Sequence, residues 1–165
     1  MRFNEDTRVK IPSILHLIYL GYDYLSLKDP TVIWDESTNI FTDIFKNSIA
    51  KINKGISDFD IENLYNEVSL CIENEDLGKA FYQKLIDRSG IKLIDFDNFN
   101  NNTFNVVTEL TYKNDDESFR PDITLLINGL PLAFIEVKKP NNPEGIQAEH
   151  SRIEKRFGNK KFKKF

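Results

Sequence analysis

The sequence predicts an α/β fold in which helices come first, three or four mainly antiparallel strands follow, and a helix comes last. Up to Gly90, apolar residues recur at helical spacing, and after it they alternate at the two-residue period of strands. Asn128-Gly129 lies between two apolar runs and is the strongest short hairpin signal in the chain. A chain of 165 residues suits one domain with its own core.

The first ninety residues contain the predicted helical region. Leucine and isoleucine are dense in residues 11–25, with Pro12 near the start and Gly21 near the end, which indicates a largely buried helix. Residues 41–55 show one apolar face and stop at a glycine. We expect helices over 11–25, 41–55 and, as two segments with a break near 73–76, over 61–90.

The strands are predicted after Gly90. IKLIDF at 91–96 and FNVVTELTYK at 104–113 have strand character, and the Asn-rich run at 98–103 is expected to be a loop. A polar loop is expected at 113–120. The hairpin then uses 123–127 and 130–138, and helical character returns at 145–157 after the PNNPEG turn.

Composition excludes several classes of protein. Hydrophobic residues make up 40% and charged residues 29%, as in ordinary soluble globular proteins. No apolar run approaches the 18 residues of a membrane span, and no apolar segment follows the charged N-terminus, so we expect neither a membrane partner nor a secretory signal. Cys71 is the one cysteine, which argues against a disulfide or a structural zinc site. The expected compartment is the cytoplasm.

Charge is unevenly distributed along the chain. The net charge is −4, yet residues 141–165 hold seven Lys or Arg against three Glu. An acidic body with a basic tail is unlike a general nucleic-acid coat protein, but it allows one basic face. A solvated end of an amphipathic helix explains the tail equally well.

The two ends of the predicted hairpin carry charged residues that could share one site. Asp122 starts the first strand, and Glu136 and Lys138 lie near the end of the second. Because strands have period two, Glu136 and Lys138 point to one face while Val137 points to the other. Two adjacent carboxylates are stable when a hard cation such as Mg²⁺ lies between them. With a lysine to orient water or stabilise charge, this set suits phosphodiester hydrolysis.

The register of the hairpin decides whether the acids can meet. With a strict two-residue loop at Asn128-Gly129, Asp122 falls opposite Ile135, and Asp122 and Glu136 face opposite sides of the sheet. A three-residue loop, or a bulge in one strand, would place the two acids on one face. The sequence therefore predicts a turn at Asn128-Gly129 that is irregular by one residue.

The string from residue 120 to 140 resembles a known nuclease motif. Arg-Pro-Asp opens the first strand, Asn-Gly-Leu-Pro forms the turn, and Ile-Glu-Val-Lys-Lys-Pro closes the hairpin. This resembles the PD-(D/E)-x-K motif in the N-terminal nuclease domain of the R (restriction and translocation) subunit of type I restriction enzymes. The likeness extends back through Leu20-Gly21-Tyr22 and Phe45 to Asn53. It implies a restriction-endonuclease-like core, with a mixed central sheet flanked by helices and an N-terminal helical region.

The resemblance assigns roles to individual residues. It implies that Asp122 and Glu136 ligate a catalytic Mg²⁺, that the backbone carbonyl of Val137 is a further ligand, and that Lys138 is the catalytic lysine. The function it implies is magnesium-dependent hydrolysis of DNA phosphodiester bonds, in defence against foreign DNA.

Two accessory residues are predicted on the same basis. Such domains often add an acid from the first helical region, for which Glu5 is the candidate. The family's Q-x-x-x-Y motif would begin at Gln147, although Ser151 stands where the tyrosine would be. Gln147 is therefore expected to contact DNA or the lysine without a tyrosine partner.

The resemblance also predicts what surrounds the domain. We expect residues 1–165 to form a single nuclease-type domain, an N-terminal fragment of a larger translocase-containing subunit. No G-x-x-x-x-G-K-[ST] motif occurs, so ATP would act only through motor domains outside this sequence. Double-stranded DNA and the methylation and specificity subunits of a type I complex are the expected partners.

Three alternatives stay open on the sequence. The charged residues could simply end a hairpin at the margin of a sheet. The fold could be a catalytically silent DNA- or protein-binding module. It could also be a stand-alone repair or junction-resolving nuclease of the same fold.

Overall fold

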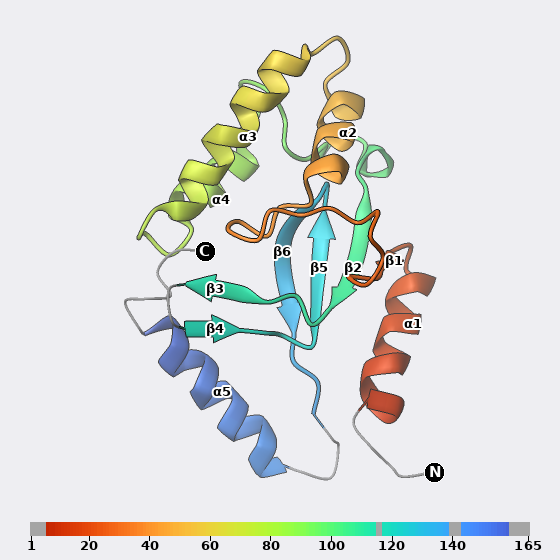
Figure 1. Ribbon diagram of the computed structural model, residues 1–165, viewed down its shortest axis with the longest axis vertical. Helices are drawn as coiled ribbons and strands as arrows, with labels where there is room; N and C mark the ends of the chain where they lie inside the picture. Colours follow the sequence, from red (N-terminus) through yellow and green to blue (C-terminus); the bar gives the residue numbers. More distant parts are fainter. Residues whose placement is uncertain (1–5, 115–116, 139–142, 159–165) are drawn as a thin grey trace.

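A four-stranded mixed sheet lies at the centre of the computed structural model, which describes residues 6–114, 117–138 and 143–158 (Figure 1). The strand order is β1-β2-β5-β6, with β1 parallel to β2 and the other neighbours antiparallel. The sheet is therefore mixed, as expected. Its strands are β1 (Asp23–Leu25), β2 (Phe104–Thr108), β5 (Ile123–Ile127) and β6 (Leu130–Ile135).

Helices surround this sheet at its side and ends. One helix runs beside β1, three gather at the end where β5 turns into β6, and one lies next to a small pair of strands, β3 (Tyr112–Asn114) and β4 (Glu117–Phe119) (Figure 1). Among the described residues, no helix is both long and apolar enough to cross a membrane. The helices are α1 (Ile11–Tyr19), α2 (Thr42–Ile52), α3 (Asp58–Glu73), α4 (Lys79–Ile86) and α5 (Pro143–Phe157). The expected amphipathic helix, the break between α3 and α4, and the late helix are confirmed.

Apolar side chains cover both faces of the sheet. On the α1 side, Leu17 packs with Val106, Ile123 and Val137. On the other side, Phe41 leads a cluster with Val107, Leu110 and Leu126. Burial on both faces explains why the central strands are almost continuously apolar rather than alternating.

The prediction of a largely buried helix at 11–25 is wrong. Only Leu17 of α1 is buried, and Leu15 is 60% exposed. The density of apolar residues predicts a largely buried helix, but α1 meets the sheet along one stripe only. The helix ends at Tyr19, and the short β1 follows it, a strand of three residues with too little pattern to be predicted.

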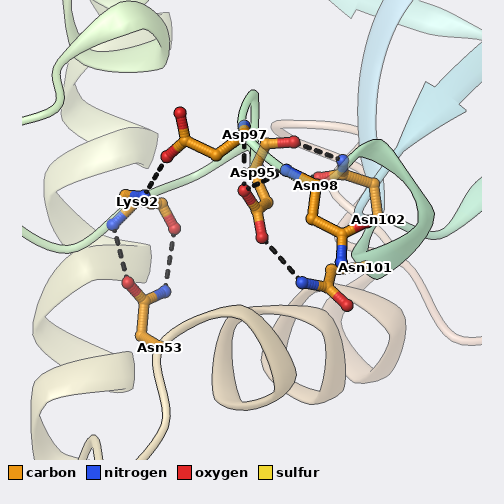
Figure 2. A network of polar contacts seen from close by, with 7 residues as sticks. All are labelled: Asn53, Lys92, Asp95, Asp97, Asn98, Asn101 and Asn102. Carbon is orange, nitrogen blue, oxygen red and sulfur yellow. Dashed lines mark hydrogen bonds and ion pairs between the residues drawn. The ribbon is translucent and has the colours of Figure 1, made fainter.

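The segment 91–96 is not a strand, contrary to the prediction. Its backbone bonds to asparagine side chains instead: the Lys92 amide donates to Asn53 Oδ1 and the Asp95 amide to Asn102 Oδ1, each at 2.9 Å (Figure 2). The Asp95 carboxylate accepts from the backbone amides of Asp97 and Asn98 at 3.0 and 2.9 Å and from Asn101 Nδ2 at 2.8 Å. The asparagine-rich run, predicted as a loop, contains a single 3₁₀ turn, η2 (Phe99–Asn101), and these bonds give the run a fixed shape.

Two further strand predictions need correction. The expected strand 104–113 breaks at Glu109, whose φ of 60° is incompatible with an extended backbone. The expected polar loop at 113–120 instead contains β4 (Glu117–Phe119), which pairs with β3 (Tyr112–Asn114) as a second, two-stranded sheet. An aromatic contact between Phe119 and Phe134 joins this pair to the main sheet.

The Asn128-Gly129 turn is regular, so the predicted three-residue loop is wrong, whereas the alternative of a bulge in one strand is confirmed. Both residues have positive φ, 53° and 79°, and Ile127 pairs with Leu130 across a two-residue loop. The irregularity lies three residues later. Leu125 pairs with Ala133 while Leu126 pairs with Pro131, which leaves the residue between them, Leu132, as a bulge in β6.

The turn is also anchored to the rest of the core. The Asn128 side chain is fully buried, donates to Leu93 O at 2.8 Å and accepts from the Thr103 amide at 2.8 Å. The carbonyl of Gly129 accepts from the Phe41 amide at 2.9 Å. The β5–β6 turn is therefore fixed against the start of α2 and cannot slide.

Gly129→Ala tests this close approach. A Cβ at Gly129 would lie 2.7 Å from both Phe41 O and Phe45 N, whereas a Cβ at Gly55 meets nothing within 4 Å. Both glycines have positive φ, so Gly55→Ala is a matched control that carries only the backbone strain of about 1–2 kcal/mol. We expect Gly129→Ala to cost about 3 kcal/mol or more in urea unfolding. Equal losses in the two variants would contradict the packing described.

Candidate active site

The bulge in β6 brings Asp122 beside Glu136. Beyond it, Ile123 pairs with Ile135, so the next residues outward along the two strands are Asp122 and Glu136. The Asp122 Oδ2 atom accepts a hydrogen bond of 2.9 Å from the Val137 amide. The two predicted acids therefore share one face and one end of the sheet, through a bulge rather than a longer turn.

Asp122 is held by the main chain on both sides. Its carboxylate bonds the Val137 amide beyond β6, and its carbonyl accepts from the Glu109 amide beyond β2 at 3.3 Å. Both β2 and β6 have ended before this point, so no strand hydrogen bonds hold the chains together here. The two bonds of Asp122 take their place. One carboxylate oxygen is used in this way, and the carboxyl group also shares a side-chain hydrogen bond with Glu136.

Glu136 is a half-buried acid whose side chain is largely covered and has an unused acceptor. Its side chain is 9% exposed, and its Oε1 atom is buried without a hydrogen-bond partner among the described residues. Burial raises the pKa of Glu136, and contact with Asp122 and the charges of Asp122 and Glu149 raise it further against the opposing effect of Lys138. The charge of Lys138 therefore does not fully offset the repulsion between Asp122 and Glu136.

Lys138 lies on the same face as Glu136, as the strand period predicts. Its Nζ atom is 3.7 Å from Glu136 Oε2 and 3.2 Å from Glu149 Oε2. Burial alone would lower the pKa of Lys138, but the hydrogen bond and charge of Glu149, with the charges of Glu136 and Asp122, outweigh it and raise the pKa. The ammonium group is therefore charged at neutral pH.

Glu149 is the member of the site that the sequence did not reveal. It lies on α5 with a side chain that is 10% exposed, and its Oε1 atom accepts from Arg152 Nε at 2.8 Å. Glu149 and Arg152 have the three-residue spacing of a helical ion pair. That spacing does not predict that Glu149 also contacts Lys138, which lies outside the helix. The predicted accessory Gln147 is exposed on α5 two residues earlier, and Glu5 lies outside the described residues.

Another acid near Asp122 is already neutralised. Glu109 Oε1 lies 2.7 Å from Nζ of the buried Lys10, and Arg120 Nη1 lies 3.8 Å from Glu109 Oε2. The hydrogen bond from Lys10, followed by its charge, lowers the pKa of Glu109. Glu109 is thus committed to structural ion pairs, which leaves Asp122 and Glu136 as the acids free to bind a cation.

The residues present fit a magnesium ion. Within the described ranges no three side chains of the His, Cys, Asp and Glu type form a metal-binding group, so a centre of several protein ligands is not offered. Mg²⁺ commonly uses one or two carboxylates and keeps several waters. The unpartnered Oε1 of Glu136, beside the Asp122 carboxylate, matches that requirement.

Comparison with known proteins identifies the family. The model of the type I restriction enzyme R protein N terminus matches residues 2–165. The chain belongs to this family. The R-subunit resemblance seen in the residues around the hairpin is therefore confirmed across the whole chain.

Relatives in this family come from the archaeon Methanocaldococcus jannaschii. A protein named as the MjaIXP endonuclease subunit of a type I restriction enzyme is 33% identical over 163 residues, a match that covers 86% of this chain and 16% of the relative. Another, named as the MjaVIIP endonuclease subunit, is 44% identical over 55 residues, or 33% of this chain and 5% of the relative. The chain thus spans a small part of the length of the R-subunit relatives it matches.

Glu136→Gln tests the state of the acid pair. A carboxyl group whose pKa is higher in the folded than in the unfolded state loses stability as pH rises through that window, so ionised Glu136 costs stability at pH 7. Without metal, we expect Glu136→Gln to raise the unfolding free energy by on the order of 1 kcal/mol, or roughly 2–4 °C in thermal midpoint. Glu75→Gln, at an exposed position, is the control and should change nothing. A lowered midpoint for Glu136→Gln would show that the pair is already compensated.

Proposed function

We propose that this chain is the magnesium-dependent endonuclease domain of a type I restriction enzyme R subunit, and that it hydrolyses DNA phosphodiester bonds. The observation that carries the proposal is the bulge at Leu132, because it sets Asp122 beside Glu136 with Lys138 adjacent. The mixed sheet with flanking helices supports a restriction-endonuclease-like core of the PD-(D/E)-x-K type.

Asp122, Glu136 and the Val137 carbonyl would hold the ion. Bound Mg²⁺ supplies positive charge for a phosphoryl oxygen and lowers the pKa of a coordinated water. The Val137 amide fixes the direction of the Asp122 carboxylate, so this ligand needs no rearrangement when the ion binds. The low exposure of the Glu136 side chain strengthens the charge interactions that it makes.

Lys138 is the group that acts on the substrate directly. An ammonium group has three donors, and the Lys138 Nζ atom is 3.2 Å from Glu149 Oε2 but 3.7 Å from Glu136 Oε2, beyond a good hydrogen bond. A donor that does not bond Glu149 can donate to a phosphate oxygen or to the attacking water. Because Lys138 stays charged, it can stabilise negative charge that develops on the phosphate in the transition state.

The remainder of the enzyme is proposed from its relatives. The relatives are named as endonuclease subunits of type I restriction enzymes, and the first is far longer than this chain, which makes up 16% of its length. We propose that the rest of the subunit carries the ATP-driven motor. Double-stranded DNA and the methylation and specificity subunits are then its partners.

Cleavage of supercoiled plasmid by the assembled restriction complex tests the function. We expect Asp122→Asn and Lys138→Ala each to reduce magnesium-dependent cleavage by about 10²–10⁴-fold, since each removes a group that acts in the transition state. Lys51→Ala, an exposed lysine on α2, is the matched control and should leave the rate unchanged.

Calorimetry with MgCl₂ separates the two roles. Asp122→Asn should lose magnesium binding, while Lys138→Ala should keep it. If all variants cut DNA equally, the site is not catalytic. If none cuts, the wild type included, but DNA binding is retained, the chain is a binding module instead.

A further inference from the structure

Glu149 lies where it can control the lysine of the proposed site. We propose that Glu149 is a positioning residue that fixes the Lys138 ammonium beside Glu136, a role that rests on the nuclease function proposed above. Glu149 comes from α5, whereas Lys138 follows β6, so the contact joins two separate elements.

A lysine needs such a partner to act from a fixed place. Its four-carbon stem carries roughly 2 kcal/mol of rotamer entropy, and one long contact would not order it. The distance of 3.7 Å from Lys138 Nζ to Glu136 Oε2 is too long for a good hydrogen bond, while that of 3.2 Å to Glu149 Oε2 is within range. Glu149 therefore makes the closer contact and sets where the ammonium group lies.

The two oxygens of Glu149 have separate partners. Oε2 faces Lys138, and Oε1 accepts from Arg152 Nε at 2.8 Å. The Arg152 side chain is 57% exposed, so it reaches in from the surface and holds a carboxylate that is 10% exposed. A buried acid pinned on one side by an arginine has little freedom to turn away from the lysine on the other.

Glu149 acts through the lysine rather than through the metal. It does not combine with Asp122 and Glu136 into a three-acid group able to hold a metal, as far as the described residues show. A role in stability alone would not explain a buried charge at this position, because apolar side chains of similar volume commonly stabilise a fold as well as a buried ion pair does. The feature that an apolar residue could not supply is a fixed acceptor for the ammonium group.

The packing of α5 brings the Glu149 carboxylate to Lys138. The Arg156 guanidinium lies over the Phe119 ring of β4, 3.9 Å from its centre, and Phe119 contacts Phe134 of β6 edge-on. These contacts join α5 to the β3–β4 pair and, through Phe119, to β6. The last helix therefore completes the site rather than merely following it.

Cleavage by the assembled complex is the first test. We expect Glu149→Gln to reduce the rate by roughly 10–100-fold, as is typical when a partner that orients an active-site group is removed. Glu149→Asp, which keeps the charge, should recover part of that loss. Glu154→Gln, an exposed acid on the same helix, is the matched control and should cut like the wild type.

The double variant shows whether the two residues act as one unit. If Glu149 works only through Lys138, then Lys138→Ala with Glu149→Gln should be no slower than Lys138→Ala alone. Magnesium affinity measured by calorimetry should change by less than about threefold in Glu149→Gln, against its loss in Asp122→Asn.

A readout without DNA or metal keeps the test independent of activity. In the chain labelled with ¹⁵N-lysine, the Lys138 ammonium group should give an ordered NMR signal in the wild type and in Glu154→Gln, and an averaged one in Glu149→Gln. An ordered signal in Glu149→Gln would overturn the proposal. So would wild-type cleavage by that variant, additive losses in the double variant, or a loss of magnesium binding like that of Asp122→Asn. If the wild type itself does not cut DNA, the nuclease function fails, and the NMR comparison still decides whether Glu149 fixes Lys138.

Discussion

The site depends on one extra residue in β6. Side chains alternate across a strand, so a shift of one residue moves every later side chain to the other face. The bulge at Leu132 makes that shift between the turn and the charged end of the hairpin. Without it, Asp122 would lie opposite Ile135, and the two acids could not share a ligand.

The bulge survives because the hairpin is fixed on both sides of it. At one end, the buried Asn128 side chain bonds Leu93 and Asn102, and Gly129 bonds the start of α2. At the other, the Asp122 carboxylate bonds the Val137 amide. Pro131 directly precedes the bulge, and β6 is an edge strand of the sheet. Proline, which has no backbone N–H to donate, is tolerated at edge strands and bulges. A slip to regular pairing would break contacts at both ends.

The scaffold and the site place opposite demands on the residues around the hairpin. The central strands are apolar on both faces and supply rigidity. The acids at their ends lower stability, since Glu136 is buried with an unused oxygen next to another carboxylate. The positive charges nearby are divided among separate tasks, with Lys10 engaged by Glu109 and Lys138 by Glu149. The Mg²⁺ proposed for the site would supply the positive charge that Asp122 and Glu136 lack.

Local pattern was enough to predict much of this arrangement. Helical period and glycine stops gave α2, α3 and α4, and the Asn128-Gly129 pair gave the hairpin. The shared face of Glu136 and Lys138 followed from the strand period alone. The need for one residue of irregularity also followed from spacing, but its position did not, because Leu132 looks like any other strand residue.

The features that the sequence did not reveal are set by tertiary contacts. The segment 91–96 reads as a strand, but side-chain bonds around Asp95 replace the ladder (Figure 2). The apolar surface of α1 is exposed because only one stripe of it meets the sheet. Glu149 resembles any helical acid until α5 docks and brings it to Lys138.

Diffraction from crystals soaked in Mn²⁺, a stand-in for Mg²⁺ with an anomalous signal, measures the central feature directly. The arrangement predicts an anomalous peak between Asp122 and Glu136, within about 2.0–2.3 Å of one oxygen of each and of the Val137 carbonyl. A peak that avoids these residues, or a hairpin in which Asp122 and Glu136 lie on opposite faces, would contradict it.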